Sequence, residues 1–266
     1  MKIKERLDKL LPELGLADTR NKAQALIMTG KVRVNGQVVS KSGAMFERNA
    51  NITVDEISQW AGRGAKKLLR AFEVFDVNVE NKICADIGAS TGGFTDVMLA
   101  KGAQRVYAVD VGYGQLIWRL ANDKRVTVMD RTNARYLTRT DFPDEIEFAG
   151  CDVSFISLKL ILPVLDDIVK EDAVVLIKPQ FEAGREKISH GVIKDAKIHF
   201  EVLENITQFI KDNTQFFISG LTYSPIRGAE GNTEFLCHLT HIKNNNFDFD
   251  INHIVMQAHK NFEEAQ

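Results

Sequence analysis

Cysteine is scarce in this chain of 266 residues, and long apolar runs are missing. The three cysteines, Cys84, Cys151 and Cys237, lie far apart, and no CxxC pair occurs. An odd number of widely spaced cysteines argues against a disulfide framework and against a zinc knuckle, so we expect buried thiols and no metal. No apolar run approaches the roughly 20 residues that a membrane-spanning helix needs. We therefore expect no membrane partner.

A secretory signal is also missing, because the first six residues, Met1 to Arg6, are mostly charged and carry no apolar core. We expect a cytoplasmic protein. The net charge of −2 conceals a marked asymmetry. Residues 1–72 hold 14 Lys and Arg against 7 Asp and Glu, which leaves 20 against 29 for the rest. A basic segment on an acidic body is typical of a nucleic-acid-binding module.

Residues 1–59 are predicted to form a first, small α+β domain. Apolar spacing indicates short helices over residues 6–16 and 21–28, and two β-prone runs flank Asn35-Gly36, a strong hairpin signal. Basic side chains recur through this segment and could share one face toward RNA phosphates. These candidate RNA-binding residues are Arg6, Lys9, Arg20, Lys22, Lys31 and Arg33.

Three stretches of this segment occur in an order and spacing that carry a resemblance. They are Arg6-Leu7-Asp8-Lys9-Leu10-Leu11, Gly15-Leu16-Ala17-Asp18-Thr19-Arg20-Asn21-Lys22-Ala23 and Gly30-Lys31-Val32-Arg33-Val34-Asn35-Gly36. Residues 1–59 resemble the small RNA-binding domain named after ribosomal protein S-four. That resemblance implies an RNA partner.

Beyond the first domain, residues 60–80 are expected to be a glycine-bearing linker and a basic first helix. From residue 81 to 243, β-prone and helix-prone segments alternate, which predicts an α/β domain with a mostly parallel sheet. Residues 244–266 are expected to be a polar, loosely patterned tail. The expected strands are 83–87, 105–109, 126–129, 146–152, 173–177, 214–223 and 234–240, and the helices are 93–100, 157–170 and 194–211.

A glycine-rich loop follows the first of these strands, from Asp86 to Asp96, and opens a helix. Glycines there allow a tight turn and a close approach of a ligand, and Asp110, at the end of the next strand, could accept hydrogen bonds from a ribose. The loop departs from G-x-G-x-x-G, which disfavours a pyrophosphate ligand and favours S-adenosylmethionine. The segment Gly88-Ala89-Ser90-Thr91-Gly92 also matches the nucleophile elbow of hydrolases, but that elbow comes later in its sheet.

Three charged residues stand at the ends of later strands. Asp152 follows the fourth strand, Lys178 follows an apolar run and precedes Pro179, and Glu234 opens the last strand after a glycine-rich loop. Ligands of open α/β sheets bind beyond the carboxyl ends of strands, so Asp152 is expected to face the same crevice as Asp86 and Asp110, and Lys178 to lie at its rim. A lysine at such a rim is costly unless it is paired or used.

Together with Arg63-Gly64-Ala65-Lys66-Lys67-Leu68 and Arg131-Thr132-Asn133-Ala134-Arg135, these motifs resemble the TlyA family over the chain to about residue 242. The family consists of ribose 2′-O-methyltransferases of ribosomal RNA with an FtsJ-like, Rossmann-like class I methyltransferase domain. The resemblance implies S-adenosylmethionine, ribosomal RNA and ribosomal subunits as partners.

A Lys-Asp-Lys-Glu tetrad of the family falls on Lys67, Asp152, Lys178 and Glu234. Lys66 competes with Lys67 for the first place, and we choose Lys67 because leucine follows it. We expect Lys178 to orient or deprotonate the hydroxyl while Lys67 positions the ribose or phosphate. Arg63 and Lys66 are further RNA-binding candidates. The expected cofactor residues are Asp86, Gly88, Ser90, Thr91, Gly92, Gly93, Phe94, Thr95, Asp110, Val111, Asp130, Arg131 and Asp152.

Three other functions compete with this hypothesis. A non-catalytic RNA-binding protein with a methyltransferase-like fold would lack cofactor binding. A pore-forming haemolysin, the family's old label, would make membranes leak. A pseudouridine synthase shares the N-terminal domain type but lacks a glycine-rich βα loop of this kind.

Overall fold

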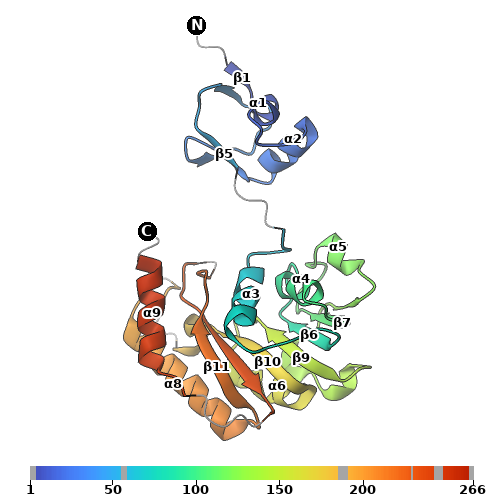
Figure 1. Ribbon diagram of the computed structural model, residues 1–266, viewed down its shortest axis with the longest axis vertical. Helices are drawn as coiled ribbons and strands as arrows, with labels where there is room; N and C mark the ends of the chain where they lie inside the picture. The colour runs from blue at the N-terminus through green and yellow to red at the C-terminus, as the bar shows by residue number, and fades with distance from the viewer. Residues whose placement is uncertain (1–3, 55–58, 185–190, 229, 243–247, 264–266) are drawn as a thin grey trace. The chain divides into compact units, whose positions relative to one another are not determined.

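The structure is a computed structural model that describes residues 4–54, 59–184, 191–228, 230–242 and 248–263. Backbone contacts divide the chain into two compact units, residues 1–59 (unit 1) and residues 60–266 (unit 2), which are visible in Figure 1.

Unit 1 packs two short helices against short strands around a small apolar core. Strand β1 pairs with β4, and β2 lies between β3 and β5. Apolar side chains at helical spacing, among them Leu7, Leu11 and Ile27, are fully buried against Val32 and Val34. The elements are β1 (Lys4–Arg6), α1 (Leu7–Glu13), α2 (Arg20–Met28), β2 (Val32–Val34), β3 (Gln37–Val38), β4 (Met45–Glu47) and β5 (Ile52–Val54).

The predicted hairpin is present, and its turn shows why Asn-Gly stands there. Asn35 and Gly36 both have positive φ, 51° and 81°, and Val34 pairs with Gln37 across the turn. A two-residue turn of this kind needs left-handed backbone at both positions, which glycine and asparagine adopt most readily.

Unit 2 is built on a seven-stranded sheet in the order β11-β12-β10-β9-β6-β7-β8. The strands from β10 to β8 are parallel, whereas β12 pairs antiparallel with both β10 and β11. The antiparallel placement of β12 brings its first residues to the edge where the parallel strands end. The strands are β6 (Ile83–Ile87), β7 (Arg105–Val109), β8 (Val126–Met129), β9 (Ile146–Cys151), β10 (Val169–Ile177), β11 (Phe217–Tyr223) and β12 (Phe235–Thr240).

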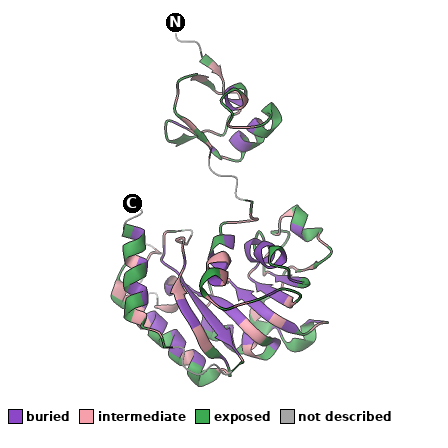
Figure 2. Ribbon diagram, in the orientation of Figure 1, coloured by how far each residue is buried: buried purple, intermediate pink, exposed green. Residues whose placement is uncertain are grey.

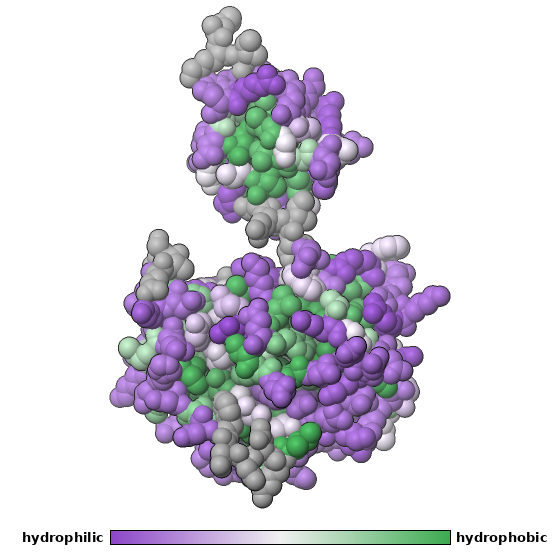
Figure 3. Space-filling model, viewed as in Figure 1, coloured by the Kyte–Doolittle hydropathy of each residue, from purple (hydrophilic) through white to green (hydrophobic). Residues whose placement is uncertain are grey.

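Helices cover both faces of this sheet, and the central strands are accordingly apolar on both sides (Figure 2). Side chains such as Cys84 and Val106 pack with α3, α4 and α5, while their strand neighbours, such as Ala85 and Tyr107, pack with α6, α8 and α9. In Figure 3, hydrophobic residues of unit 2 show through the middle of the viewed face, with hydrophilic residues around them. The helices are α3 (Ala65–Val74), α4 (Gly93–Ala100), α5 (Trp118–Ala121), α6 (Leu162–Ile168), α7 (Pro179–Glu182), α8 (Ala196–Asn213) and α9 (Ile251–Glu263).

Two expectations from the sequence were wrong in detail. The single helix expected over residues 157–170 is a 3₁₀ turn, Leu158–Leu160, followed by α6. Pro163 stands in the first turn of α6, where its missing amide hydrogen costs nothing, so the proline starts a new helix. Strand β10 then begins at Val169 rather than at residue 173.

The tail expected to be loosely patterned contains α9, which packs on α8 and β11. Ile254, Val255, Ala258 and Phe262 bury one face of this helix. On the same interface, His199 of α8 is fully buried and its Nδ1 lies 2.9 Å from Nε2 of His259. Burial, with a contribution from His259, lowers the pKa of His199 to about 4.

This histidine pair predicts an acid-sensitive step in stability. Because the pKa of His199 is lower in the folded chain than in the unfolded chain, the unfolded state takes up a proton first as the pH falls. The free energy of unfolding should therefore drop by up to about 3 kcal/mol between pH 6.5 and pH 4 on this account. Urea unfolding of His199→Gln over that range should show a smaller drop than the wild-type protein; equal drops would contradict the assignment.

Candidate active site

Strand β6 carries a buried carboxylate, Asp86, just before the loop that leads to α4. Asp86 is 1% exposed, and its Oδ2 accepts hydrogen bonds from the backbone amide and the hydroxyl of Thr95, at 2.7 and 2.6 Å. Its Oδ1 is buried and has no hydrogen-bond partner. Burial raises the pKa of Asp86 to about 7. A buried carboxylate oxygen without a donor is costly, which marks this atom as one that a ligand could satisfy.

Gly88 is required at this turn for two reasons. Its φ is +89°, and a Cβ built there would lie 2.8 Å from the carbonyl oxygen of Asp152. The loop after β6 therefore presses directly against the chain after β9, which delivers Asp152.

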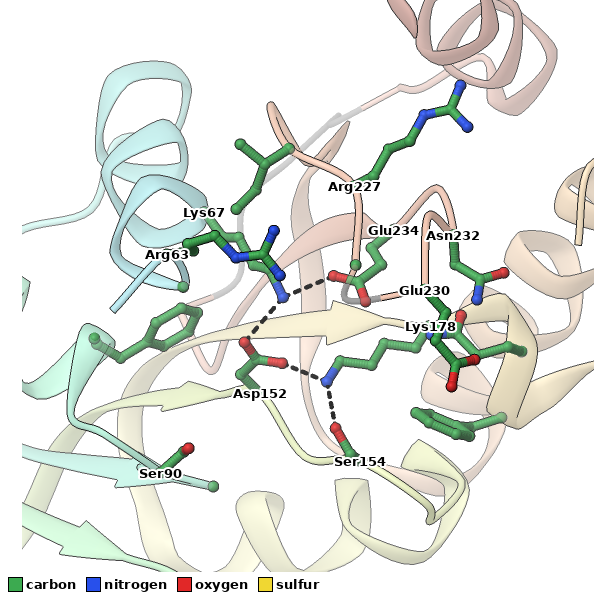
Figure 4. Close-up of a pocket in the computed structure, with 18 of the residues that line it drawn as sticks. Arg63, Lys67, Ser90, Asp152, Ser154, Lys178, Arg227, Glu230, Asn232 and Glu234 are labelled. Carbon is green, nitrogen blue, oxygen red and sulfur yellow. Dashed lines mark hydrogen bonds and ion pairs between the residues drawn. The ribbon is translucent and has the colours of Figure 1, made fainter. Parts of the chain in front are cut away.

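Four charged side chains from four elements meet at the carboxyl edge of the sheet (Figure 4). The ammonium group of Lys67, on α3, lies 3.1 Å from Oδ2 of Asp152 and 2.7 Å from Oε2 of Glu234. The ammonium group of Lys178 lies 2.5 Å from Oδ1 of Asp152 and 2.9 Å from the hydroxyl of Ser154. Asp152 thus lies between the two lysines and pairs with both.

The neighbouring charges of the cluster favour the ionised forms of Lys67 and Asp152. Burial alone would lower the pKa of Lys67, but the carboxylates of Asp152 and Glu234 raise it above its ordinary value. Burial would likewise raise the pKa of Asp152, yet Lys67 and Lys178 keep it below its ordinary range. Each lysine therefore faces a carboxylate rather than only the other ammonium group. Such a paired, buried cluster is weak evidence for stability and stronger evidence for a site.

The tetrad and the glycine loop line one pocket of about 610 Å³, a size typical of small-molecule sites. Several of the residues expected from the sequence line this pocket: Arg63, Lys67, Asp86, Gly88, Ser90, Thr91, Gly93, Phe94, Asp152, Lys178 and Glu234. Among the described residues, no group of three or more His, Cys, Asp or Glu side chains could hold a metal ion.

Six expected cofactor residues do not line the pocket. Thr95 instead holds Asp86, and Gly92 is the left-handed residue that precedes α4. The two carboxylate oxygens of Asp110 accept hydrogen bonds from the backbone amides of Ser90 and Gly112, at 2.8 and 2.7 Å. The others directly follow the carboxyl ends of β7 and β8: Val111, Asp130 and Arg131.

The expected RNA-binding residues are distributed over both units. Lys66 is exposed on α3, in contrast to the buried Lys67 beside it. In unit 1, Lys9, Lys22 and Lys31 are exposed, and Arg33 is partly exposed. Arg6 and Arg20 both pair with the buried Asp8.

The structure adds pocket residues that the sequence pattern did not single out. Phe155 has a φ of +63° and is 91% exposed, with its ring 5.2 Å from that of Phe181. Exposure of a large aromatic ring at a pocket rim cannot be foreseen from a strand-end motif, in which phenylalanine ordinarily fills the core. Further additions include Ser154, Gln180, Arg227 and Asn232.

Comparison with known families decides between the possible chemistries of this pocket. The profile of the FtsJ-like methyltransferase family matches residues 60–241, and that of the S4 domain matches residues 5–52. The chain belongs to the FtsJ-like methyltransferase family. The matched residues contain the complete tetrad and the glycine loop of this FtsJ-like methyltransferase.

Named relatives cover most of the chain. YqxC of Bacillus subtilis is 49% identical over 89% of this chain and 85% of its own length. The 16S/23S rRNA (cytidine-2′-O)-methyltransferase TlyA of Mycobacterium tuberculosis is 40% identical over 88% of this chain and 89% of its own length. Hemolysin A of Brachyspira hyodysenteriae is 43% identical over 88% of this chain and 98% of its own length.

A solved structure from Streptococcus thermophilus, described as a candidate hemolysin, is 45% identical to this FtsJ-like methyltransferase. It matches with a TM-score of 0.78 over 100% of this chain and 99% of that one. In the described part of the present chain, helices of the length and apolar character needed to cross a bilayer are absent.

The close contact at Gly88 leads to a matched pair of substitutions. Gly88→Ala should lower the free energy of unfolding by about 3 kcal/mol, because the new Cβ meets backbone atoms and the backbone is strained. Gly114→Ala, where φ is +64° and no atom lies within 4 Å, should cost only about 1 kcal/mol. Urea unfolding of both variants measures the difference, and equal costs would show that the contact carries no energy.

Proposed function

We propose that this FtsJ-like methyltransferase transfers a methyl group from S-adenosylmethionine to a ribose 2′-hydroxyl of ribosomal RNA. The observation that carries the proposal is the Lys67-Asp152-Lys178-Glu234 cluster, which lies in one pocket with the glycine loop. The relative TlyA of Mycobacterium tuberculosis is named as a 16S/23S rRNA (cytidine-2′-O)-methyltransferase, which supports the same chemistry here.

The loop after β6 has the features that S-adenosylmethionine needs. This compound supplies a methyl group on a positively charged sulfur and also carries an ammonium group. The partnerless Oδ1 of Asp86 can accept a hydrogen bond from that ammonium group, and Gly88 lines the same pocket. Asp110, directly after β7, is proposed to hold the ribose, and Asp130, directly after β8, to lie near the adenine ring; Val111 and Arg131 are their neighbours in the chain.

Lys178 is proposed to act on the target hydroxyl. A ribose hydroxyl is a poor nucleophile until its proton leaves, and orienting it accounts for much of the catalysis. Lys178 is 6% exposed, and Asp152 and Ser154 hold its ammonium group in place. Lys67 is held charged by two carboxylates and is suited to bind the ribose or its phosphate. Asp152 fixes the spacing of the two lysines.

Two residues at the pocket rim are suited to the rest of the target nucleotide. The exposed ring of Phe155 presents a flat apolar face on which a base can stack, and base–aromatic stacking is worth about 1–3 kcal/mol. Arg63 is exposed and lines the pocket, where its guanidinium can bind a phosphate. Unit 1 is proposed to bind ribosomal RNA or a ribosomal subunit in the cytoplasm through its basic residues.

Removing the amine of Lys178 should separate catalysis from cofactor binding. In Lys178→Ala, methyl transfer to ribosomal subunits should fall at least 1000-fold, because the hydroxyl loses the group that orients it, while calorimetry should show S-adenosylmethionine affinity within a few fold of wild type. Lys197→Ala, at an exposed position of α8, is the control and should transfer normally. Full activity of Lys178→Ala would refute the role.

Cofactor affinity should depend on the ionisation of Asp86. With its pKa near 7 in the free protein, Asp86 is mostly protonated at pH 6 and mostly ionised at pH 8, and only the ionised form attracts an ammonium group. S-adenosylmethionine should therefore bind about tenfold more tightly at pH 8 than at pH 6, with release of a proton. Calorimetry in buffers of different ionisation enthalpy measures both effects, and Asp86→Asn should bind weakly at either pH. A wild-type affinity that stays constant over this range would refute the role of Asp86.

The proposed function is tested by incubating the protein with labelled S-adenosylmethionine and purified ribosomal subunits, followed by nucleoside analysis. A 2′-O-methylated nucleoside is the expected product. Methylation of a base would retain the family and overturn the ribose assignment, whereas cofactor binding without transfer to either subunit would overturn the ribosomal substrate.

A further inference from the structure

A buried carboxylate in unit 1 receives four hydrogen bonds from three side chains. Asp8, in the first turn of α1, has a fully buried side chain. Its Oδ1 accepts from Nε of Arg6 at 2.9 Å, and its Oδ2 accepts from Nη2 of Arg6 at 2.9 Å. The same Oδ2 also accepts from Nε of Arg20 at 3.1 Å and from Nε2 of Gln24 at 2.8 Å, both on α2.

The charge on Asp8 is held firmly. The hydrogen bond from Arg6 is the largest influence on this carboxyl, and it keeps the pKa of Asp8 well below its usual range despite the opposing effect of burial; Gln24 and Arg20 contribute further. Asp8 is therefore ionised throughout the physiological range. A buried carboxylate with these partners is a rigid anchor, because losing any donor would leave a buried charge unsatisfied.

The two arginines it holds remain open to solvent. The side chain of Arg6 is 42% exposed and that of Arg20 is 50% exposed. In the part of the chain that the structure describes, Asp8 is the one carboxylate with which either arginine forms an ion pair. Two guanidinium groups that would repel each other thus bond to the same oxygen atom, and each keeps N–H groups that Asp8 does not use.

This arrangement fits an RNA phosphate. Arginine binds phosphate through its planar fork, and a fork whose orientation is already fixed loses less conformational freedom on binding. We propose that Arg6 and Arg20 form one phosphate-binding site for RNA and that Asp8 is the residue that positions them. The inference rests on the proposed role of unit 1 in RNA binding, and it adds an acidic residue to a surface otherwise defined by basic ones.

The sign of one substitution separates positioning from simple electrostatics. Asp8→Asn removes a negative charge from an RNA-binding surface, so charge alone predicts tighter binding. Positioning predicts weaker binding, because Arg6 and Arg20 lose their shared anchor. Asp18→Asn is the matched control: Asp18 is on the same unit, pairs with Lys22 at 2.6 Å and is 80% exposed. Its removal should leave affinity unchanged or raise it.

The experiment measures binding of the full chain to fluorescently labelled ribosomal RNA over a range of salt concentrations. Asp8→Asn should weaken binding about tenfold and reduce the number of phosphate contacts derived from the salt dependence, as should Arg6→Ala and Arg20→Ala. In the Asp8→Asn background, Arg6→Ala should cost much less than in the wild-type protein. Asp8→Glu should recover part of the affinity.

A second variant leaves Asp8 intact and serves if circular dichroism shows that Asp8→Asn unfolds unit 1. Arg6→Lys keeps the charge but cannot bridge both carboxylate oxygens with one fork, so it should lose nearly as much affinity as Arg6→Ala. Affinity of Asp8→Asn at or above wild type, with both arginine variants weakened, would overturn the positioning role and leave RNA binding intact. Wild-type affinity in Arg6→Ala and Arg20→Ala would instead show that unit 1 does not bind RNA through these residues.

Discussion

The catalytic unit depends on one shared carboxylate. Asp152 faces two ammonium groups in a pocket where little water screens them, and without it Lys67 and Lys178 would repel each other. Removing one member of such a buried set commonly costs about 3–5 kcal/mol, because a charge is left without its partner. Helix α3, the ends of β9 and β10 and the start of β12 are all held at one point by this set of charges. The position of β12 matters most here, since only an antiparallel strand beside β10 can bring its first residues to the edge where β10 ends.

Much of the fold could be predicted from the sequence, for reasons that differ between elements. Strands β6 and β7 were predicted with their correct bounds because they are short apolar runs that end at a glycine-rich loop or an aspartate. The region from residue 157 to 177 was misjudged because the apolar periodicity of a helix continues across Pro163 and reaches Val169, the buried first residue of β10. The helix α9 was missed although Ile254, Val255, Ala258 and Phe262 follow helical spacing, because its polar residues are as numerous as its apolar ones.

The candidate site, like the fold, could be predicted from the sequence only in part. The identity of the four charged residues could be predicted, since three of them stand at strand ends and the family resemblance supplies the fourth. Their pairing could not, because sequence does not show that Asp152 lies between the lysines; the choice of Lys67 over Lys66 came from the leucine that follows it in the family pattern. The position of Phe155 depends on a left-handed backbone at a non-glycine residue, which no local sequence pattern predicts. The contact of Asp8 with Arg20 is also tertiary, because it joins α1 and α2, whereas Arg6 stands only two residues from Asp8.

The order of these groups along the chain has a consequence for synthesis. Unit 1 ends at residue 59, so its fold is fully encoded early and can form while translation continues. The pocket, by contrast, draws Lys67 from one end of unit 2 and Glu234 from the other, and such long-range contacts form only after the intervening chain is available. A nascent chain shorter than 234 residues thus carries unit 1 without the assembled charge cluster of unit 2. The S4 domain can therefore be complete on the ribosome that makes the protein before the pocket of unit 2 exists.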